Sequence, residues 1–166
     1  MVLAVLVRTL GGGNTLIGML STIRVSGWLL PQFLIAGWIQ SLPRKAPFVS
    51  VTALTRAVMY GLLAALAFVL GQSHPSLLLL LLFVIFALSR MIMGASGLAR
   101  YDVFGDVMSP ARRAKFFATR NFWGGVFVVG AGFLVRLMLD SDKGMPFPGN
   151  FSMLLALSCF FSWWMV

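Results

Sequence analysis

Three arginines stand inside long apolar stretches of the sequence, where a charged side chain is costly. Arg24 and Arg56 lie nine and eight residues into the first two stretches, and Arg90 lies eight residues before the end of the third. At 1.5 Å per helical residue, each is about 12 to 14 Å from a helix end. A central arginine costs about 2.5 to 3.5 kcal/mol on membrane insertion, so it needs water, a partner or a bound anion.

The depth of these arginines within apolar stretches predicts a buried polar binding site. We expect Arg24 and Arg90 to project into a polar cavity and to meet an anionic or polar substrate. Two other interpretations stay open for them, namely snorkelling to the cytoplasmic interface and pairing with a residue outside this chain. Arg56 lies nearest a basic edge, so for this residue we expect snorkelling or pairing rather than a place in the substrate cavity.

Groups suited to catalysis or metal binding are few. The sequence has no Glu, and none of its four Asp falls in an apolar stretch. His74 sits in a short Gln-Ser-His-Pro turn, and Cys159 is the only cysteine. Because catalytic and metal sites need several such groups to converge, we expect no enzyme, no metal site and no cofactor.

The composition is that of a membrane protein. Of the 166 residues, 60% are hydrophobic and 10% are charged, and the mean hydropathy is +0.95. A soluble domain with a polar shell does not reach these values. A net charge of +9 would suggest nucleic acid in a soluble protein, but here the basic residues fall mainly between apolar stretches. We therefore expect the lipid bilayer, and no nucleic acid, as a partner.

Four stretches are long enough to span a bilayer as helices, which takes about 20 apolar residues. They cover roughly 15–40, 48–71, 76–98 and 121–139, and two shorter apolar segments, 1–7 and 151–166, flank them. The sequence thus predicts an all-α, polytopic transmembrane helix bundle whose end segments are cut helices. The alternative is a true start at Met1, with the first segment at the membrane interface and five spans.

Basic residues predict the orientation of these helices. Two connections, about 41–47 and 99–120, carry seven of them: Arg44, Lys45, Arg100, Arg112, Arg113, Lys115 and Arg120. The connections 9–14, 72–75 and 140–150 contain only Lys143. By the positive-inside rule, the two basic connections face the cytoplasm. We expect a multi-pass protein of the plasma (inner) membrane, with an aromatic belt of Trp38, Tyr101 and Trp123 near its cytoplasmic face.

The 99–120 connection has a helical pattern of its own. Asp102 and Asp106 are four residues apart, so on a helix they share a face and can pair with Arg100 or with the following basic cluster. Ser109 and Pro110 are typical of an N-cap and a first helical residue, which predicts a basic helix over 111–120. Candidate gating or charge-pair residues are Arg44, Lys45, Asp102, Asp106, Arg112 and Arg113. The alternative is a surface elbow on anionic lipid.

Small residues recur in two spans. They are Gly94-Ala-Ser-Gly97 in the third and Gly124, Gly125, Gly130 and Gly132 in the fourth. Small side chains let helix backbones approach closely, so we expect helix packing at both places.

Two connections resemble those of a transporter family. DVMSPARRAKFFATRN (106–121), followed by FWGG, resembles the loop between helices four and five of bacterial major facilitator superfamily (MFS) transporters. TLGGGNTLIG (9–18) is similar to that family's turn between helices one and two. The resemblance covers essentially the whole chain and implies an MFS-like N-terminal half, from late helix 1 to partial helix 6. It also implies alternating access around a central cavity, with Arg90 on a lining helix.

The chain departs from the family pattern at two places. GWIQSLPRKA (37–46) keeps the family's Gly and the Arg44–Lys45 pair but lacks its Asp, so we expect Asp102 or Asp106 to partner Arg44. Residues 124–132 contain no proline, whereas drug-proton antiporters of the family carry a Gly-Pro element there. This difference weakens an antiporter assignment.

Together, these features favour secondary transport of a small solute by an MFS-type transporter. The missing C-terminal half of the same protein is the expected partner, and this fragment alone is expected to be inactive. A non-transporting membrane scaffold or assembly protein on the same fold is the alternative, and a polytopic membrane enzyme comes third.

Overall fold

The computed structural model of the chain describes residues 2–139 and 147–164. Within these ranges the chain is all helical and has no strand, which confirms the all-α part of the predicted fold class. Its helices are α1 (Val2–Thr9), α2 (Asn14–Gln40), α3 (Lys45–Leu70), α4 (Pro75–Val107), α5 (Pro110–Leu139) and α6 (Gly149–Trp164). Four of them, α2 to α5, are long and apolar enough to cross a membrane.

The largest difference from the predicted boundaries is in the 99–120 connection. It is mostly helical, because α4 continues through Val107 and α5 begins at Pro110. Met108, which follows α4, has an extended backbone, with φ −119° and ψ 135°. Proline disfavours helical backbone in the residue before it, here Ser109, and fits the first turn of a helix, so Pro110 favours a break just before it and a new helix that starts with it. The predicted basic helix is therefore the first part of α5, and most of the predicted 140–150 connection lies outside the described residues.

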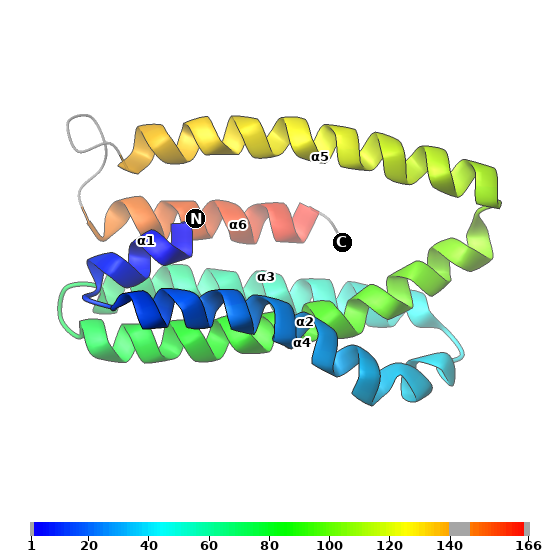
Figure 1. The fold of residues 1–166 in the computed structure, drawn as a ribbon, viewed down its shortest axis with the longest axis horizontal. Helices are drawn as coiled ribbons and strands as arrows, with labels where there is room; N and C mark the ends of the chain where they lie inside the picture. Colours follow the sequence, from blue (N-terminus) through cyan, green and yellow to red (C-terminus); the bar gives the residue numbers. More distant parts are fainter. Residues whose placement is uncertain (1, 140–146, 165–166) are drawn as a thin grey trace.

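The long helices lie side by side along the molecule (Figure 1). The α2–α3 and α4–α5 connections lie at one end, and the α1–α2 and α3–α4 connections lie at the other. We call the first the basic end, because it holds residues 41–47 and 99–120. The two basic connections thus lie on one side of the bundle, as the predicted antiparallel succession of helices requires.

A buried core lies toward the opposite end. Leu6 of α1, Leu63 of α3 and Leu82 of α4 are fully buried, and Phe151 of α6 packs in the same cluster. Between helices in lipid, such contacts stabilise mainly through close van der Waals fit. This cluster fixes α1, α3, α4 and α6 relative to one another.

Helices α2 and α4 approach each other closely through two glycines. A Cβ atom on Gly94 would lie 2.3 Å from the Trp28 carbonyl oxygen, and one on Gly27 would lie 2.9 Å from the Cβ of Arg90. The packing prediction is thus confirmed at Gly94. It also follows that the backbone of α2 rests directly on Arg90.

Helix α5 stands apart from the other helices (Figure 1). No residue of α5 is buried, and large apolar side chains such as Phe127 and Val128 are exposed. The packing prediction is wrong for its glycines, since a Cβ on any of them would meet no atom within 4 Å; they are Gly124, Gly125, Gly130 and Gly132. The apolar surface of α5 is therefore open to lipid or to another helix.

Candidate functional site

A cavity of about 660 Å³ lies among all six helices. We call it the central cavity. Most of its wall is apolar, and the exceptions are hydroxyl and guanidinium side chains: Ser21, Arg24, Arg56, Tyr60, Arg90 and Ser158. Both predicted cavity residues, Arg24 and Arg90, thus lie on one cavity. Within the described ranges, no acidic residue lines it.

Arg90 is the most constrained of the three arginines. Its guanidinium carbon lies 4.7 Å from the centre of the Phe86 ring, a cation–π contact. One terminal nitrogen lies 3.6 Å from the Met93 sulfur, which is a weak acceptor. The Nε atom is buried and has no hydrogen-bond partner among the described residues. A buried donor left in this state favours binding of an acceptor from a ligand or water.

Arg24 reaches the same cavity from α2. It is exposed, and it precedes Gly27 by three residues, which places both on one side of the helix. A Cβ on Gly27 would lie 2.9 Å from the Cβ of Arg90, so the close α2–α4 packing accounts for the presence of both arginines on one cavity.

Arg56 also lines the central cavity, which the sequence analysis did not predict. It lies eleven residues into α3, about 16 Å from the start of the helix, and it is half-buried. Tyr60, four residues later, lines the cavity with it. Our expectation that Arg56 snorkels or pairs stays a prediction, since a residue on the cavity wall can still reach toward the basic end. An Arg and a Tyr at i and i+4 share a helix face, and this spacing could have indicated a common polar surface.

An ion pair joins α3 and α4 at the basic end. The Lys45 ammonium lies 3.0 Å from a carboxylate oxygen of Asp102. From the sequence we expected Asp102 or Asp106 to replace the acid missing from the 37–46 segment, with Arg44 as the partner. The structure pairs Asp102 with Lys45 instead, and Arg44 is exposed. Asp106 lies on α4, and its side chain is outside the described part of the structure.

Arg113 holds the α4–α5 elbow. One of its terminal nitrogens donates to the carbonyl oxygens of Gly105, at 2.9 Å, and Met108, at 3.3 Å. Carbonyls at the end of a helix lack intrahelical partners and carry partial negative charge, so a cation satisfies them well. Among the described residues, the partners of Arg113 are these backbone carbonyls, while its expected pairing with Asp106 falls on a side chain that the structure does not describe. Arg112 is exposed.

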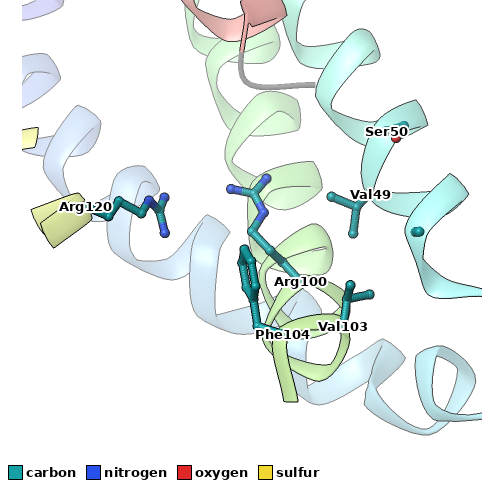
Figure 2. A pocket seen from close by; sticks show the side chains of 7 residues that line it. Val49, Ser50, Arg100, Val103, Phe104 and Arg120 are labelled. Atoms are coloured by element: carbon teal, nitrogen blue, oxygen red, sulfur yellow. The ribbon is translucent and has the colours of Figure 1, made fainter. Parts of the chain in front are cut away.

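A second, smaller cavity of about 350 Å³ lies at the basic end. We call it the crevice. It is lined by residues of α3, α4 and α5: Ala46, Val49, Ser50, Arg100, Val103, Phe104 and Arg120. Figure 2 shows the Arg100 and Arg120 side chains reaching toward each other from α4 and α5, beside the Phe104 ring. Both arginines were expected in the basic connection, but their place on one cavity was not predicted.

Comparison with known proteins does not extend this description. No protein-family model matches the chain, and no curated protein or solved structure is significantly similar to it.

Proposed function

We propose that this chain forms most of one helical half of an MFS-type secondary transporter, which moves a small solute by alternating access. The observation that carries the proposal is the central cavity, where arginines from α2, α3 and α4 meet inside a bundle of apolar helices. A second helical half of the same protein would complete the cavity wall, as the resemblance to the family implies.

The free-energy cost of placing three arginines in a membrane supports a functional role for them. At about 2.5 to 3.5 kcal/mol each on the insertion scale, three central arginines together cost about 8 to 10 kcal/mol. Arg90 packs on Phe86 and has a buried Nε atom without a partner, so the fold offers no strong compensating contact to it. Charged groups at such depth generally mark substrate or ion pathways.

The Lys45–Asp102 ion pair supplies a candidate gate for this transporter. It links the basic ends of α3 and α4, next to the crevice residues Ala46 and Val103. Because Asp102 is 42% exposed at its side chain, the pair is weak enough to break and re-form during a conformational cycle.

A membrane scaffold remains the second candidate, and α5 favours it. Its apolar surface has no buried residue, so a partner helix would find a large uncovered surface there. The two candidates differ in what they require, since a scaffold needs α5 but not the central arginines.

Solute uptake tests the proposal. Proteoliposomes would contain this chain together with the rest of its reading frame, and labelled organic acids, sugars and amino acids would be offered. We expect Arg90→Gln to lower initial uptake about tenfold or more, because a charge-assisted hydrogen bond is lost. Arg112→Gln, which removes the same charge from an exposed site, should change uptake less than about twofold.

Equal uptake by the Arg90→Gln variant and the unmodified protein would refute the cavity as a transport site. If a folded protein transports none of the solutes, while Val128→Asn on α5 disrupts its assembly, the scaffold candidate replaces the transporter.

A further inference from the structure

Five arginines line the two cavities of this molecule. Arg24, Arg56 and Arg90 face the central cavity, and Arg100 and Arg120 face the crevice. We call these five residues the arginine ladder. They come from α2, α3, α4 and α5, and no described residue lining either cavity is acidic.

The ladder has two levels along the bundle. The Lys45–Asp102 ion pair places these two residues at the same level. From there, Arg56 is eleven residues along α3 and Arg90 twelve residues along α4, which puts both about 16 to 18 Å deeper. Arg100 is only two residues from Asp102, about 3 Å along the axis. The crevice therefore lies near the basic end and the central cavity lies well inside.

Like charges gather at both levels and repel one another. Arg24, Arg56 and Arg90 share the central cavity, and Arg100 and Arg120 share the crevice. With no carboxylate on either wall, a bound anion is the species that best relieves this repulsion. Guanidinium groups bind carboxylate and phosphate oxygens through paired, charge-assisted hydrogen bonds.

The central cavity also indicates the size and shape of that anion. At about 660 Å³, it falls within the range of about 300 to 1,000 Å³ that small-molecule sites occupy. The rest of its wall is largely apolar and includes Leu20, Leu134 and Leu155. An organic anion with an apolar part fits this wall better than a small inorganic ion does.

We propose that the arginine ladder binds one small organic oxyanion, a carboxylate or a phosphate ester, at two successive places. The crevice exchanges it with the cytoplasm, and the central cavity holds it. This inference rests on the proposed function, since it names the class of the transported solute.

A binding experiment separates the two places. Purified full-length protein in phosphatidylcholine nanodiscs would be offered labelled citrate, labelled glucose 6-phosphate and, as the uncharged match, labelled glucose, at constant ionic strength. Equilibrium binding and association rates would be measured for Arg90→Gln, for Arg100→Gln with Arg120→Gln, and for the control Arg112→Gln. Arg90→Lys keeps the charge and serves if Arg90→Gln does not fold.

We expect one or both anions to bind, and glucose not to bind. Arg90→Gln should raise the Kd about tenfold or more, the effect expected from losing a charge-assisted hydrogen bond, and Arg90→Lys should raise it less. The Arg100→Gln, Arg120→Gln double variant should slow association of the anion about tenfold with a smaller change in Kd, because the positive charge of the crevice attracts the entering anion. Citrate alone or glucose 6-phosphate alone would identify the carboxylate or the phosphate ester as the ligand.

Three results would overturn the inference. The first is that neither anion binds, or that glucose binds equally well. In the second, Arg112→Gln weakens binding as much as Arg90→Gln, so that only overall charge matters. The third is that phosphatidylglycerol in the nanodiscs abolishes anion binding, which would make a lipid headgroup the ligand.

The proposed function fails in a different way. If anions bind through Arg90 but are never taken up into proteoliposomes, the anion site stands and the transporter proposal falls. If the protein transports only an uncharged solute, and Arg90→Gln does not affect it, the transporter proposal stands and the anion inference falls.

Discussion

Replacing Gly94 by alanine should push α2 and α4 apart and so disturb the central cavity. The new Cβ atom would lie 2.3 Å from the Trp28 carbonyl oxygen and 3.1 Å from its Cα, whereas ordinary contact begins at 3.4 Å. Both neighbours are backbone atoms that no rotamer change can move, so α2 must shift by about 1 Å. Overpacking of this kind costs about 1 to 3 kcal/mol.

Gly130→Ala is a matched control, because a Cβ on Gly130 of α5 would meet no atom within 4 Å. Each substitution gains about 1 kcal/mol of helix propensity, which cancels in the comparison. We therefore expect Gly94→Ala to be about 1 to 3 kcal/mol less stable than Gly130→Ala.

Unfolding by dodecyl sulfate in mixed micelles, followed by tryptophan fluorescence, would measure this difference. Anion binding should weaken as well, since Gly27 on the same helix interface contacts Arg90. Equal stability of the two variants would refute the close α2–α4 packing on which the position of Arg90 depends.

Three further predictions concern the basic end. Arg113→Gln should speed hydrogen exchange over 105–113 and lower the free energy of unfolding by about 1 to 3 kcal/mol, because the Gly105 and Met108 carbonyls lose a charged donor. Similar exchange in Arg112→Gln would contradict this. Asp102→Asn should lower the free energy of unfolding by less than about 1 kcal/mol, since its ion pair with Lys45 is partly exposed. A double-mutant cycle with Lys45→Met measures the coupling energy of the pair. A coupling energy above about 2 kcal/mol would mean that the pair is too strong for a gate. Cysteines replacing Ser41 and Ser73 should react with impermeant maleimide from the cytoplasmic and outer sides, respectively, after replacement of Cys159, and labelling of both from one side would refute the topology.

The helix positions followed closely from the sequence. Runs of about 20 apolar residues have few alternatives to a membrane-spanning helix, and α2 and α3 begin within three residues of the predicted spans. The elbow was also predictable, because proline acts locally on its neighbours and Pro110 begins α5 as expected. The apolar pattern ended the third span at residue 98, and only the spacing of Asp102 and Asp106 indicated that the helix continues, as α4 does to Val107.

The charge pairs at the basic end were only partly predictable. The sequence indicated that an aspartate of α4 replaces the acid missing between α2 and α3, and Asp102 does contact that region. Predicting Lys45 rather than Arg44 as the partner of Asp102 required the exact residue at which α3 begins, because Arg44 precedes the helix and Lys45 begins it. The contacts of Arg113 were missed because backbone carbonyls at a helix end leave no trace in the residue types.

The arginines show why the depth of a residue in the membrane is easier to predict than the side of the helix on which it lies. The number of residues from a helix end gives the depth of Arg24, Arg56 and Arg90 directly. The side of the helix on which each lies depends on which neighbour it faces, and α2, α3 and α4 are apolar nearly all round, so no polar stripe marks an inner face. Arg90 could be assigned to the cavity only through the resemblance, and Arg56 was assigned away from it. The close approach of α2 to Arg90 at Gly27 shows which side of α4 carries Arg90. It fixes how α2 and α4 face each other, and α3 then brings Arg56 to the same cavity.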